Sequence, residues 1–341
     1  MTPNEGTTAV NRSVRTLLAT ALCLVLALSL AACAAPATPA GPAAGPTTPA
    51  PVVIRIGTLP TEDSLPLWVA ERDGSFATAG IDVTITVFAS AVERDAALTA
   101  GAIDGEMGDL IAAAALREGG VPVKVATIML GATATEGRFG IAVKPGSKVT
   151  DLKGLANVPV GTSSATIQEF VLDQLMEAAG VPAAKVKTVE VKKVPVRFEQ
   201  LMAGGIDAAA LPEPFLSLAE KTGAKVIADD TKGANISQTV MLFSEKYLNA
   251  AGSADAVTRL LGVWDAAAAT INADPASFRQ LLVDKAKLPA PLATSYVVNT
   301  YPKAQLPTEE EVTRVLDWMQ TKGLIKTPLT YGDLTWTAAA K

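Results

Sequence analysis

The sequence predicts an α/β fold with largely parallel strands, divided between two lobes. From residue 52 onward, short β-branched runs alternate with helical patterns, which is typical of α/β proteins. About 290 residues follow the N-terminal segments, a length that suits two medium lobes better than one. Segments 98–104 and 201–207 also share Leu, Ala, Gly, Ile and Asp at a constant offset of 103 residues.

The expected elements follow that alternation along the chain. Strands are expected at 52–57, 81–88, 123–130, 139–143, 159–161, 186–191, 206–211 and 225–227. Helices are expected at 66–73 and 91–100, and the pattern after residue 247 is almost entirely helical, at 254–273, 277–286 and 309–322. The apolar spacing of Leu260, Trp264 and Ala268 predicts that these late helices pack on a lobe.

The first 32 residues have the pattern of an export signal. Arg12 and Arg15 precede an uncharged run from 16 to 30 that is rich in Leu and Ala. The run ends in Leu-Ala-Ala and then Cys33, which resembles the lipobox of bacterial lipoproteins. That resemblance implies cleavage before Cys33 and acylation of it, and each buried methylene of an acyl chain contributes roughly 0.8 kcal/mol to membrane binding. An ordinary cleaved signal or an N-terminal anchor helix are the alternatives.

Residues 33–51 form the next predicted segment. It consists mainly of Ala, Pro, Thr and Gly, without a charge or a large apolar side chain. Such a segment cannot bury a core, so we expect an extended tether between the lipid anchor and the folded lobes.

Composition excludes several classes of catalytic site. The chain has no histidine, and its two cysteines are Cys23, inside the signal, and Cys33. The lobes therefore have no Ser-His-Asp or Cys-His catalysis, no disulfide and no ordinary zinc site. A carboxylate-only or lysine-based enzyme stays open, but we expect no enzymatic activity, no metal and no cofactor.

Net charge and hydropathy limit the classes of partner that we expect. The formal net charge is −5, with acids and bases interspersed, which argues against a nucleic-acid partner. No apolar run after residue 30 approaches the ~20 residues of a membrane-spanning helix. No Gly-x-x-x-x-Gly-Lys-Ser/Thr run occurs either, so any ATP hydrolysis belongs to a separate subunit.

The repeated segments predict where a ligand would bind. Each indicates a helix that ends on glycine, followed by a tight turn and a short strand. The two strands end near carboxylates, Asp109 and Glu213. Because ligands of open α/β sheets bind outside the carboxyl ends of strands, two such lobes would hold a ligand between them. The alternative explanation of the repeated segments is chance recurrence of residues that are common in turns.

Several segments together resemble the NMT1/THI5-like family of solute-binding proteins, which serve importers of the nitrate, sulfonate, taurine and thiamine-precursor type. They are Leu65-Pro-Leu-Trp-Val-Ala-Glu71, Gly74-Ser-Phe76, Ala79-Gly-Ile-Asp-Val83, Gly101-Ala-Ile-Asp104, Asp151-Leu-Lys-Gly154, Gly161-Thr-Ser163, Leu211-Pro-Glu-Pro-Phe215 and the helix of Trp318. Each piece is weak by itself, but their order and spacing cover nearly the whole mature chain.

The resemblance implies a type II periplasmic-binding-protein fold, with two α/β lobes, two crossing segments and a ligand cleft. We expect lobe one to comprise 52–142 and 242–341, and lobe two 143–241. The implied partners are a small-molecule solute, an ABC permease and an ATPase, with the chain a monomer anchored at the extracytoplasmic face of the cell membrane.

Two candidate ligand contacts follow the first strand. Asp63, beside Glu62, could accept hydrogen bonds from a ligand, or Asp63 or Ser64 could simply cap the next helix, which Pro66 near its first turn favours. Trp68 could stack on a planar ligand or lie in the core.

Further candidates lie at later strand ends. Asp109 either faces the cleft or caps the helix that follows. Thr162, Ser163 and Ser164 join a strand to a helix, where hydroxyls and free amides suit a carbonyl, carboxylate or sulfonate.

The last candidates come from the second repeat and the crossing segment. Glu213 and Phe215 place a carboxylate beside an aromatic ring, although Glu213 could instead bond a backbone amide. Arg138 could pair with an anionic ligand, with Glu136 or with the opposite lobe. We expect Arg197 to be solvated or to form an ion pair.

Carboxylates outnumber arginines among these candidates, and burying them against an anion would cost free energy. The sequence therefore favours a neutral heteroaromatic ligand, riboflavin or a thiamine-type pyrimidine, taken up for vitamin import. The alternative is an alkanesulfonate, taurine or nitrate anion. A pyrimidine-related enzyme and a chemosensory receptor on the same fold are rival functions.

Overall fold

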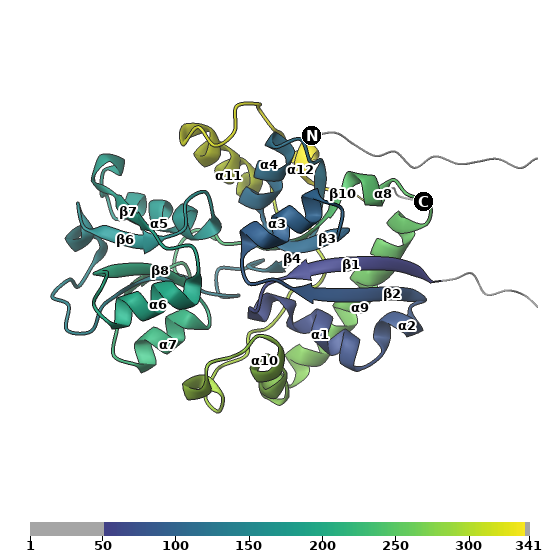
Figure 1. Cartoon of the computed structure of the whole chain (residues 1–341), viewed down its shortest axis with the longest axis horizontal. Coiled ribbons are helices and arrows are strands. Elements are labelled where there is room, and N and C mark those ends of the chain that lie inside the picture. Colours follow the sequence, from purple (N-terminus) through teal and green to yellow (C-terminus); the bar gives the residue numbers. More distant parts are fainter. Residues whose placement is uncertain (1–50, 338–341) are drawn as a thin grey trace, which may run out of the picture. The chain divides into compact units, whose positions relative to one another are not determined.

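The computed structural model describes residues 51–337, which contain two five-stranded sheets with helices packed against them (Figure 1). This arrangement confirms the predicted α/β fold. The predicted signal, the lipidation site Cys33 and residues 33–50 of the predicted tether lie outside the described residues. Among the helices of the described part, none is long and apolar enough to cross a membrane.

The first sheet combines strands from both halves of the chain. Its strands, in spatial order, are β2 (Ile81–Val87), β1 (Val52–Thr58), β3 (Gly105–Asp109), β10 (Thr239–Ser244) and β4 (Val123–Leu130). Strands β2, β1 and β3 are parallel, whereas β10 runs antiparallel to both β3 and β4.

The second sheet has the same plan. Its strands, in spatial order, are β7 (Lys187–Glu190), β6 (Pro159–Thr162), β8 (Ala208–Pro212), β5 (Phe139–Val143) and β9 (Lys225–Asp229). Here β5 is the antiparallel strand, paired with β8 and β9. The two sheets therefore match strand for strand, and each takes its antiparallel strand from a segment that arrives from the other sheet.

The predicted internal repeat is confirmed in the backbone. Helix α3 (Ala91–Thr99) is followed by Gly101 at φ 71° and then β3, and helix α6 (Val194–Met202) by Gly204 at φ 76° and then β8. Both glycines occupy the left-handed region, where a side chain would be strained.

The predicted lobe boundaries differ from the sheet membership at both crossings. The prediction put residues 139–142 in lobe one and 239–241 in lobe two, but β5 is hydrogen-bonded in the second sheet and β10 in the first. The chain thus crosses between Leu130 and Phe139, and again between Asp229 and Thr239. Which sheet a strand joins depends on its hydrogen-bonded pairing with neighbouring strands, and a short apolar run in the sequence does not reveal that pairing. Strand β10 was not among the expected elements.

Helices cover the two sheets in two groups. Around the first sheet lie α1 (Leu65–Arg72), α2 (Ser75–Thr78), α3, α4 (Leu110–Glu118), α8 (Glu245–Leu248), α9 (Ser253–Ala273), α10 (Arg279–Lys285), α11 (Glu309–Thr321) and α12 (Tyr331–Leu334). Around the second lie α5 (Ile167–Ala178), α6 and α7 (Phe215–Lys221). Short 3-10 turns occur at Glu62–Ser64, Leu152–Leu155, Ala183–Lys185, Pro275–Phe278 and Ala290–Leu292.

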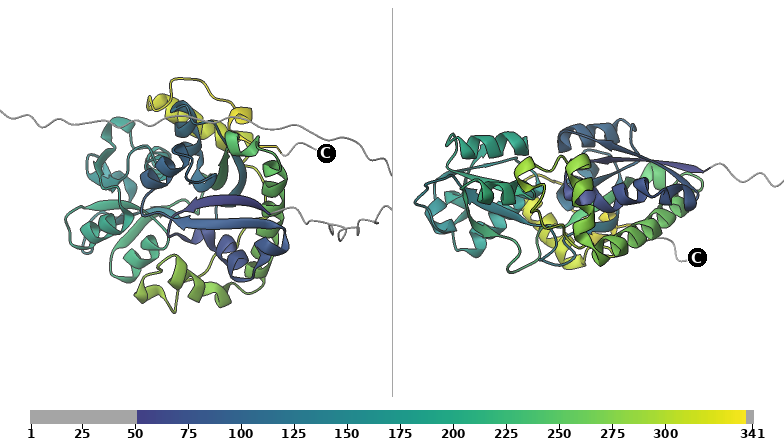
Figure 2. Two further views of the ribbon diagram at one scale, coloured as in Figure 1. Left: turned by 45° about the vertical axis from the view of Figure 1, so that its right-hand side comes forward. Right: turned by 90° about the horizontal axis from the view of Figure 1, so that it is seen from below.

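The late helices pack on the first sheet's side, as predicted. Trp264 of α9 is fully buried in the same core cluster as Trp68 of α1. Figure 2 shows the green α9 beside the purple α1, and these two helices are in contact. Helix α11 begins with a capping box in which Thr308 and Glu311 bond each other's backbone amides.

Candidate functional site

A cavity of about 230 Å³ lies between the two sheets and draws its lining from both. Its lining comes mainly from the segments that follow strands β1, β2, β3, β6, β7 and β8, together with Arg138 and Phe139. These parallel strands present their carboxyl ends to the cavity, which is where ligands bind in open α/β sheets. Of the predicted site residues, the lining includes Asp63, Asp109, Arg138, Ser163, Glu213 and Phe215.

Asp63 neither caps α1 nor is left free. Its Oδ1 accepts a hydrogen bond of 2.7 Å from the Thr239 hydroxyl of β10, and no side-chain cap is formed on α1. The carboxylate thus ties the loop after β1 to the strand that returns from the second sheet.

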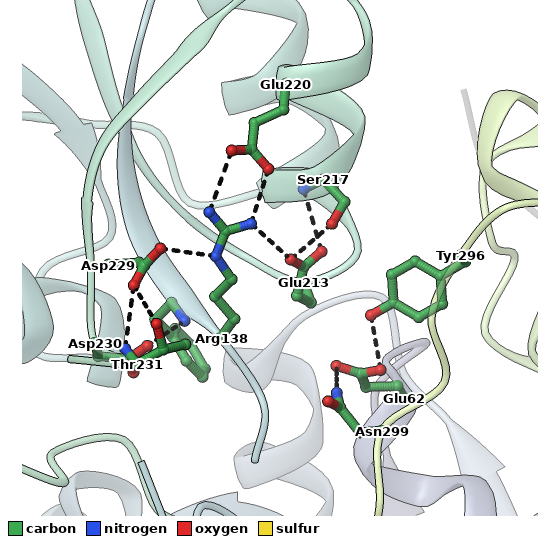
Figure 3. A network of polar contacts seen from close by, with 11 residues as sticks. Glu62, Arg138, Glu213, Ser217, Glu220, Asp229, Asp230, Thr231, Tyr296 and Asn299 are labelled. Atoms are coloured by element: carbon green, nitrogen blue, oxygen red, sulfur yellow. Dashed lines mark hydrogen bonds and ion pairs between the residues drawn. The ribbon is translucent and has the colours of Figure 1, made fainter. Parts of the chain in front are cut away.

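The neighbouring Glu62 is held in a buried network (Figure 3). Tyr296 and Asn299 each donate to its carboxyl group at 2.7 Å. Burial and the charge of Glu213 raise the pKa of Glu62 well above its ordinary value, which favours the neutral acid.

Trp68 does not line the cavity. It is 1% exposed and lies in the hydrophobic core cluster that also contains Trp264 of α9. The core alternative is therefore correct, and the interpretation of Trp68 as a ligand contact is wrong.

Asp109 combines both of its predicted roles. It lines the cavity, and its Oδ1 accepts a 2.7 Å hydrogen bond from Ala112 as the N-cap of α4. Burial raises the pKa of Asp109, although the bond from the Ala112 amide opposes this shift.

The hydroxyl segment after β6 is only partly available to a ligand. Ser163 lines the cavity, but its hydroxyl and the hydroxyl and amide of Ser164 donate to Glu190 at 3.5, 2.6 and 3.0 Å. Thr162 is fully buried outside the lining. Thr162 and Ser164 thus do not contact the cavity as expected, because Thr162 points into the fold and Ser164 bonds the end of β7.

Arg138 forms ion pairs with carboxylates of the second sheet and of its helix α7 (Figure 3). Its guanidinium contacts Glu220 at 2.8 Å, Asp229 at 2.9 Å and Glu213 at 3.5 Å. The alternative pairing with Glu136 is not formed, since Glu136 accepts a hydrogen bond from the amide of Ala132.

Glu213 and Phe215 complete the lining at the end of β8. Glu213 accepts hydrogen bonds from the amide and hydroxyl of Ser217 at 3.1 and 2.8 Å, as its structural alternative predicted. Burial raises the pKa of Glu213, and the bonds from Ser217 and the charge of Arg138 oppose this. Phe215 lines the cavity and contacts Phe198 at 5.8 Å between ring centroids.

Sequence reasoning missed further lining residues, including Arg94, Asp95, Gln168 and Lys192. It also misplaced Arg197, which is neither solvated nor ion-paired but 0% exposed and bonded to backbone carbonyls and Gln168. A signal for the two arginines was present, since Arg94 and Arg197 are separated by the same 103 residues as the repeated segments.

The charged lining is unequal on the two sides. The first sheet's elements contribute Glu62, Asp63, Asp95 and Asp109 with Arg94, and the second sheet's elements contribute Glu213 with Arg138 and Lys192. Within the described part of the chain, no group of three or more Asp, Glu, His or Cys side chains is placed to hold a metal ion. The arrangement suits binding of a small polar molecule.

Comparison with known proteins places the chain in a family. The model of the NMT1/THI5-like family matches residues 61–277, and the chain belongs to that family. A search of the curated proteins found no match.

Solved structures share the fold at low sequence identity. The alkanesulfonate-binding protein SsuA of Xanthomonas axonopodis pv. citri, bound to MOPS, is 18% identical, with a TM-score of 0.69 over 84% of this chain and 98% of that one. The periplasmic nitrate-binding protein NrtA of Synechocystis PCC 6803 is 14% identical, with a TM-score of 0.68 over 83% and 84%. The desulfurization enzyme DSZB is 15% identical, with a TM-score of 0.60 over 83% and 96%. The fold is thus that of the periplasmic binding proteins, as predicted.

Proposed function

We propose that this chain is the solute-binding component of an ABC importer and that its solute carries an anionic head group of the sulfonate or nitrate type. The observation that carries the proposal is the cavity lined from both sheets. Family membership supports the binding role. The likeness to alkanesulfonate- and nitrate-binding proteins favours the anion over the heteroaromatic ligand expected from the sequence.

The carboxylates of the cavity no longer argue against an anion. Asp63, Asp109 and Glu213 each accept hydrogen bonds from the protein's own groups. Their role in the fold accounts for their burial without a ligand that donates hydrogen bonds.

Donors for an anion are present on the opposite wall. Helix α5 begins at Ile167 without a side-chain cap, and Ile167 and Gln168 both line the cavity. The first amide groups of a helix have no intrahelical partner and favour negative charge. This end of α5 therefore supports binding of a sulfonate or nitrate group.

A heteroaromatic vitamin or precursor is the second candidate ligand. Phe139 and Phe215 line the cavity and provide aromatic surface for a planar ring. Asp63 and Glu213 also line the cavity, and carboxylate oxygens can accept hydrogen bonds from ring NH groups. Riboflavin and a thiamine-type pyrimidine therefore belong in the same binding experiment.

We propose that the chain binds its solute without transforming it. The absence of histidine, and of cysteine after residue 33, removes the imidazole base and the thiolate nucleophile. Because an enzyme shares the fold, the bound solute should be recovered and identified by mass spectrometry. Recovery of an altered molecule would contradict the proposed role.

The partners and location form part of the proposal. An acylated Cys33 and its tether would hold a monomeric receptor at the extracytoplasmic face of the membrane, close to a permease and its ATPase. Replacing Cys33 with Ser should release the chain from membranes into the soluble fraction. Retention of the variant on membranes would contradict the lipid anchor.

The ligand class is tested by thermal unfolding of chain 33–341 carrying Cys33→Ser. The solutes are ethanesulfonate, taurine, nitrate, riboflavin, thiamine and its pyrimidine precursor. A ligand at 100 times its dissociation constant adds ~2.7 kcal/mol, which should raise the Tm by several degrees. A shift with sulfonates or nitrate supports the anion, and a shift with only the ring compounds supports the second candidate. No shift with any of them would contradict both.

A further inference from the structure

Arg197 is a buried cation directly behind the cavity wall. It is 0% exposed on α6, and its Nε and Nη2 donate to the carbonyl of Val191 at 3.0 and 2.7 Å. Its Nη1 donates to the carbonyl of Ala210 at 2.7 Å and to Gln168 Oε1 at 3.2 Å. Gln168 is therefore the residue that connects this cation with the cavity.

The internal repeat shows that Arg197 lacks the counter-ions of its counterpart. Arg94 occupies the same place in the first repeat, where it contacts Asp95 at 2.7 Å and Glu106 at 3.2 Å. The positions that correspond to these two carboxylates hold Phe198 and Ala209. Among the ion pairs of the described residues none involves Arg197, although the charge of Glu190 acts on it.

Arg197 nevertheless keeps its charge at neutral pH. Burial lowers its pKa to about 10, which the charge of Glu190 partly opposes. A buried cation without a close counter-ion is costly. An anion bound at the adjacent cavity wall would supply the missing negative charge.

The contact with Arg197 also orients the amide of Gln168. A guanidinium only donates hydrogen bonds, so the oxygen of Gln168 must face Arg197. The amide nitrogen, with its two N–H donors, is then directed away from Arg197, and Gln168 is a lining residue of the cavity. Nearby hydroxyl donors are not equivalent, because Ser163 and Ser164 already donate to Glu190.

We propose that Gln168 binds the anionic head group of the solute and that Arg197 is its positioning residue, so that the solute lies with its anionic end toward the second sheet. The inference rests on the proposed function and adds to it the residue that recognises the head group. The opposite wall, with Asp63, Asp95 and Asp109, then faces the remainder of the solute.

Gln168→Glu tests the donor with a matched control. The substitution keeps the size and an acceptor for Arg197 but replaces the N–H donors with a second oxygen. Gln174→Glu introduces the same charge on the same helix, outside the cavity lining. Titration calorimetry with ethanesulfonate and nitrate should show about 30-fold weaker binding for Gln168→Glu and less than about 2-fold for Gln174→Glu. The proposal is overturned if Gln168→Glu and Gln174→Glu weaken the binding of each anion by the same factor.

Failure of the proposed function gives a different result. If the unsubstituted protein binds neither anion, the anionic ligand is wrong and the role of Gln168 falls with it. If it binds them and Gln168→Glu binds them equally well, only the role of Gln168 is wrong. Ethanesulfonamide provides a neutral comparison. Loss of a donor that binds an anion should weaken the binding of ethanesulfonate more than the binding of ethanesulfonamide.

A double-mutant cycle tests the positioning role. Arg197→Met should weaken ethanesulfonate binding about tenfold by itself, but by less than about 2-fold in a Gln168→Met background. A merely structural arginine would weaken binding by the same factor in both backgrounds, which would overturn the positioning role. The Gln168 variants keep the proposal testable if Arg197→Met does not fold.

Discussion

Two adjacent aspartates at the end of β9 have pKa values shifted in opposite directions. Asp229 bonds Thr231 at 2.6 Å and Arg138 at 2.9 Å, and these contacts lower its pKa although burial opposes them. Asp230 is 2% exposed and accepts a 2.9 Å hydrogen bond from the amide of Phe139. Burial raises the pKa of Asp230 to about 6. Their spacing in sequence gives no sign of this difference.

Asp230→Asn should change how stability depends on pH. The folded pKa lies above the ordinary value, so the folded chain binds the proton more tightly than the unfolded chain. The stabilisation that protonated Asp230 contributes is fully present below about pH 4 and is lost as the pH rises through about 6. Its loss lowers the free energy of unfolding by about 2–3 kcal/mol. Asn keeps the acceptor for Phe139 and does not titrate.

Urea unfolding at pH 4, 5, 6 and 7 measures this effect. The difference in unfolding free energy between Asp230→Asn and the unsubstituted chain should shift in favour of the variant between pH 4 and pH 7. A difference that is constant across these pH values would show that Asp230 does not titrate in this range.

Trp68→Phe separates core packing from ligand binding. The smaller ring leaves unfilled space between α1 and α9, so the variant should lose about 1–3 kcal/mol of unfolding free energy. The dissociation constant for the solute should stay unchanged because Trp68 does not line the cavity. Calorimetric binding and urea unfolding of the same preparation provide both values, and weaker binding at unchanged stability would contradict this placement.

At the scale of elements, α11 and the residues that follow it pack against α5. Trp318 Nε1 donates to Asp173 at 2.9 Å, and the Phe170 and Trp318 rings make an edge contact at 5.3 Å. Lys322 contacts Asp173 and Glu169, each at 2.9 Å. The helix that begins at the cavity is thus attached to the C-terminal part of the chain.

Asp173→Ala should weaken this attachment. It removes the acceptor of Trp318 and one of the two ion pairs of Lys322, which we expect to cost about 1–2 kcal/mol of unfolding free energy. Asp173→Asn is the control, because it keeps an acceptor for the indole and loses only the charge. It should cost less than Asp173→Ala in urea unfolding, and equal losses would assign the effect to the ion pair with Lys322.

At the scale of the whole described chain, the two sheets are joined by crossing segments and share a cavity lined from both. A solute that contacts both sides should favour a closed arrangement of the lobes, which is the usual hinge response of such receptors. Contacts such as Lys221 Nζ to Ser295 Oγ, at 2.8 Å, already connect α7 with the segment after α10.

Spin labels can measure this closure directly. With Cys33→Ser, residues 33–341 contain no cysteine, so in that segment Glu93→Cys on α3 and Glu199→Cys on α6 would be labelled specifically. Both positions are exposed. The distance between the labels should shorten by roughly 2 Å or more when the solute binds. An unchanged distance distribution at saturating solute would contradict closure.

Much of the fold could be predicted because it depends on local pattern. The alternation of β-branched runs and helical spacing predicted most of the strands and the late helices. The offset of 103 residues predicted the repeated helix, turn and strand, since glycine is needed at the left-handed positions Gly101 and Gly204. The composition by itself excluded the histidine and cysteine chemistries.

The tertiary structure decided which strand joins which sheet and which candidate side chains face the cavity. β10 belongs to the first sheet through hydrogen bonds to β3 and β4, which lie more than a hundred residues earlier. Asp63 bonds Thr239, Ser164 bonds Glu190, and Arg197 contacts Gln168 across the fold. The sequence by itself determined the kinds of elements and their order, because local propensity and periodicity act over a few residues. The site required the folded chain, because its polar groups are satisfied by partners distant in sequence.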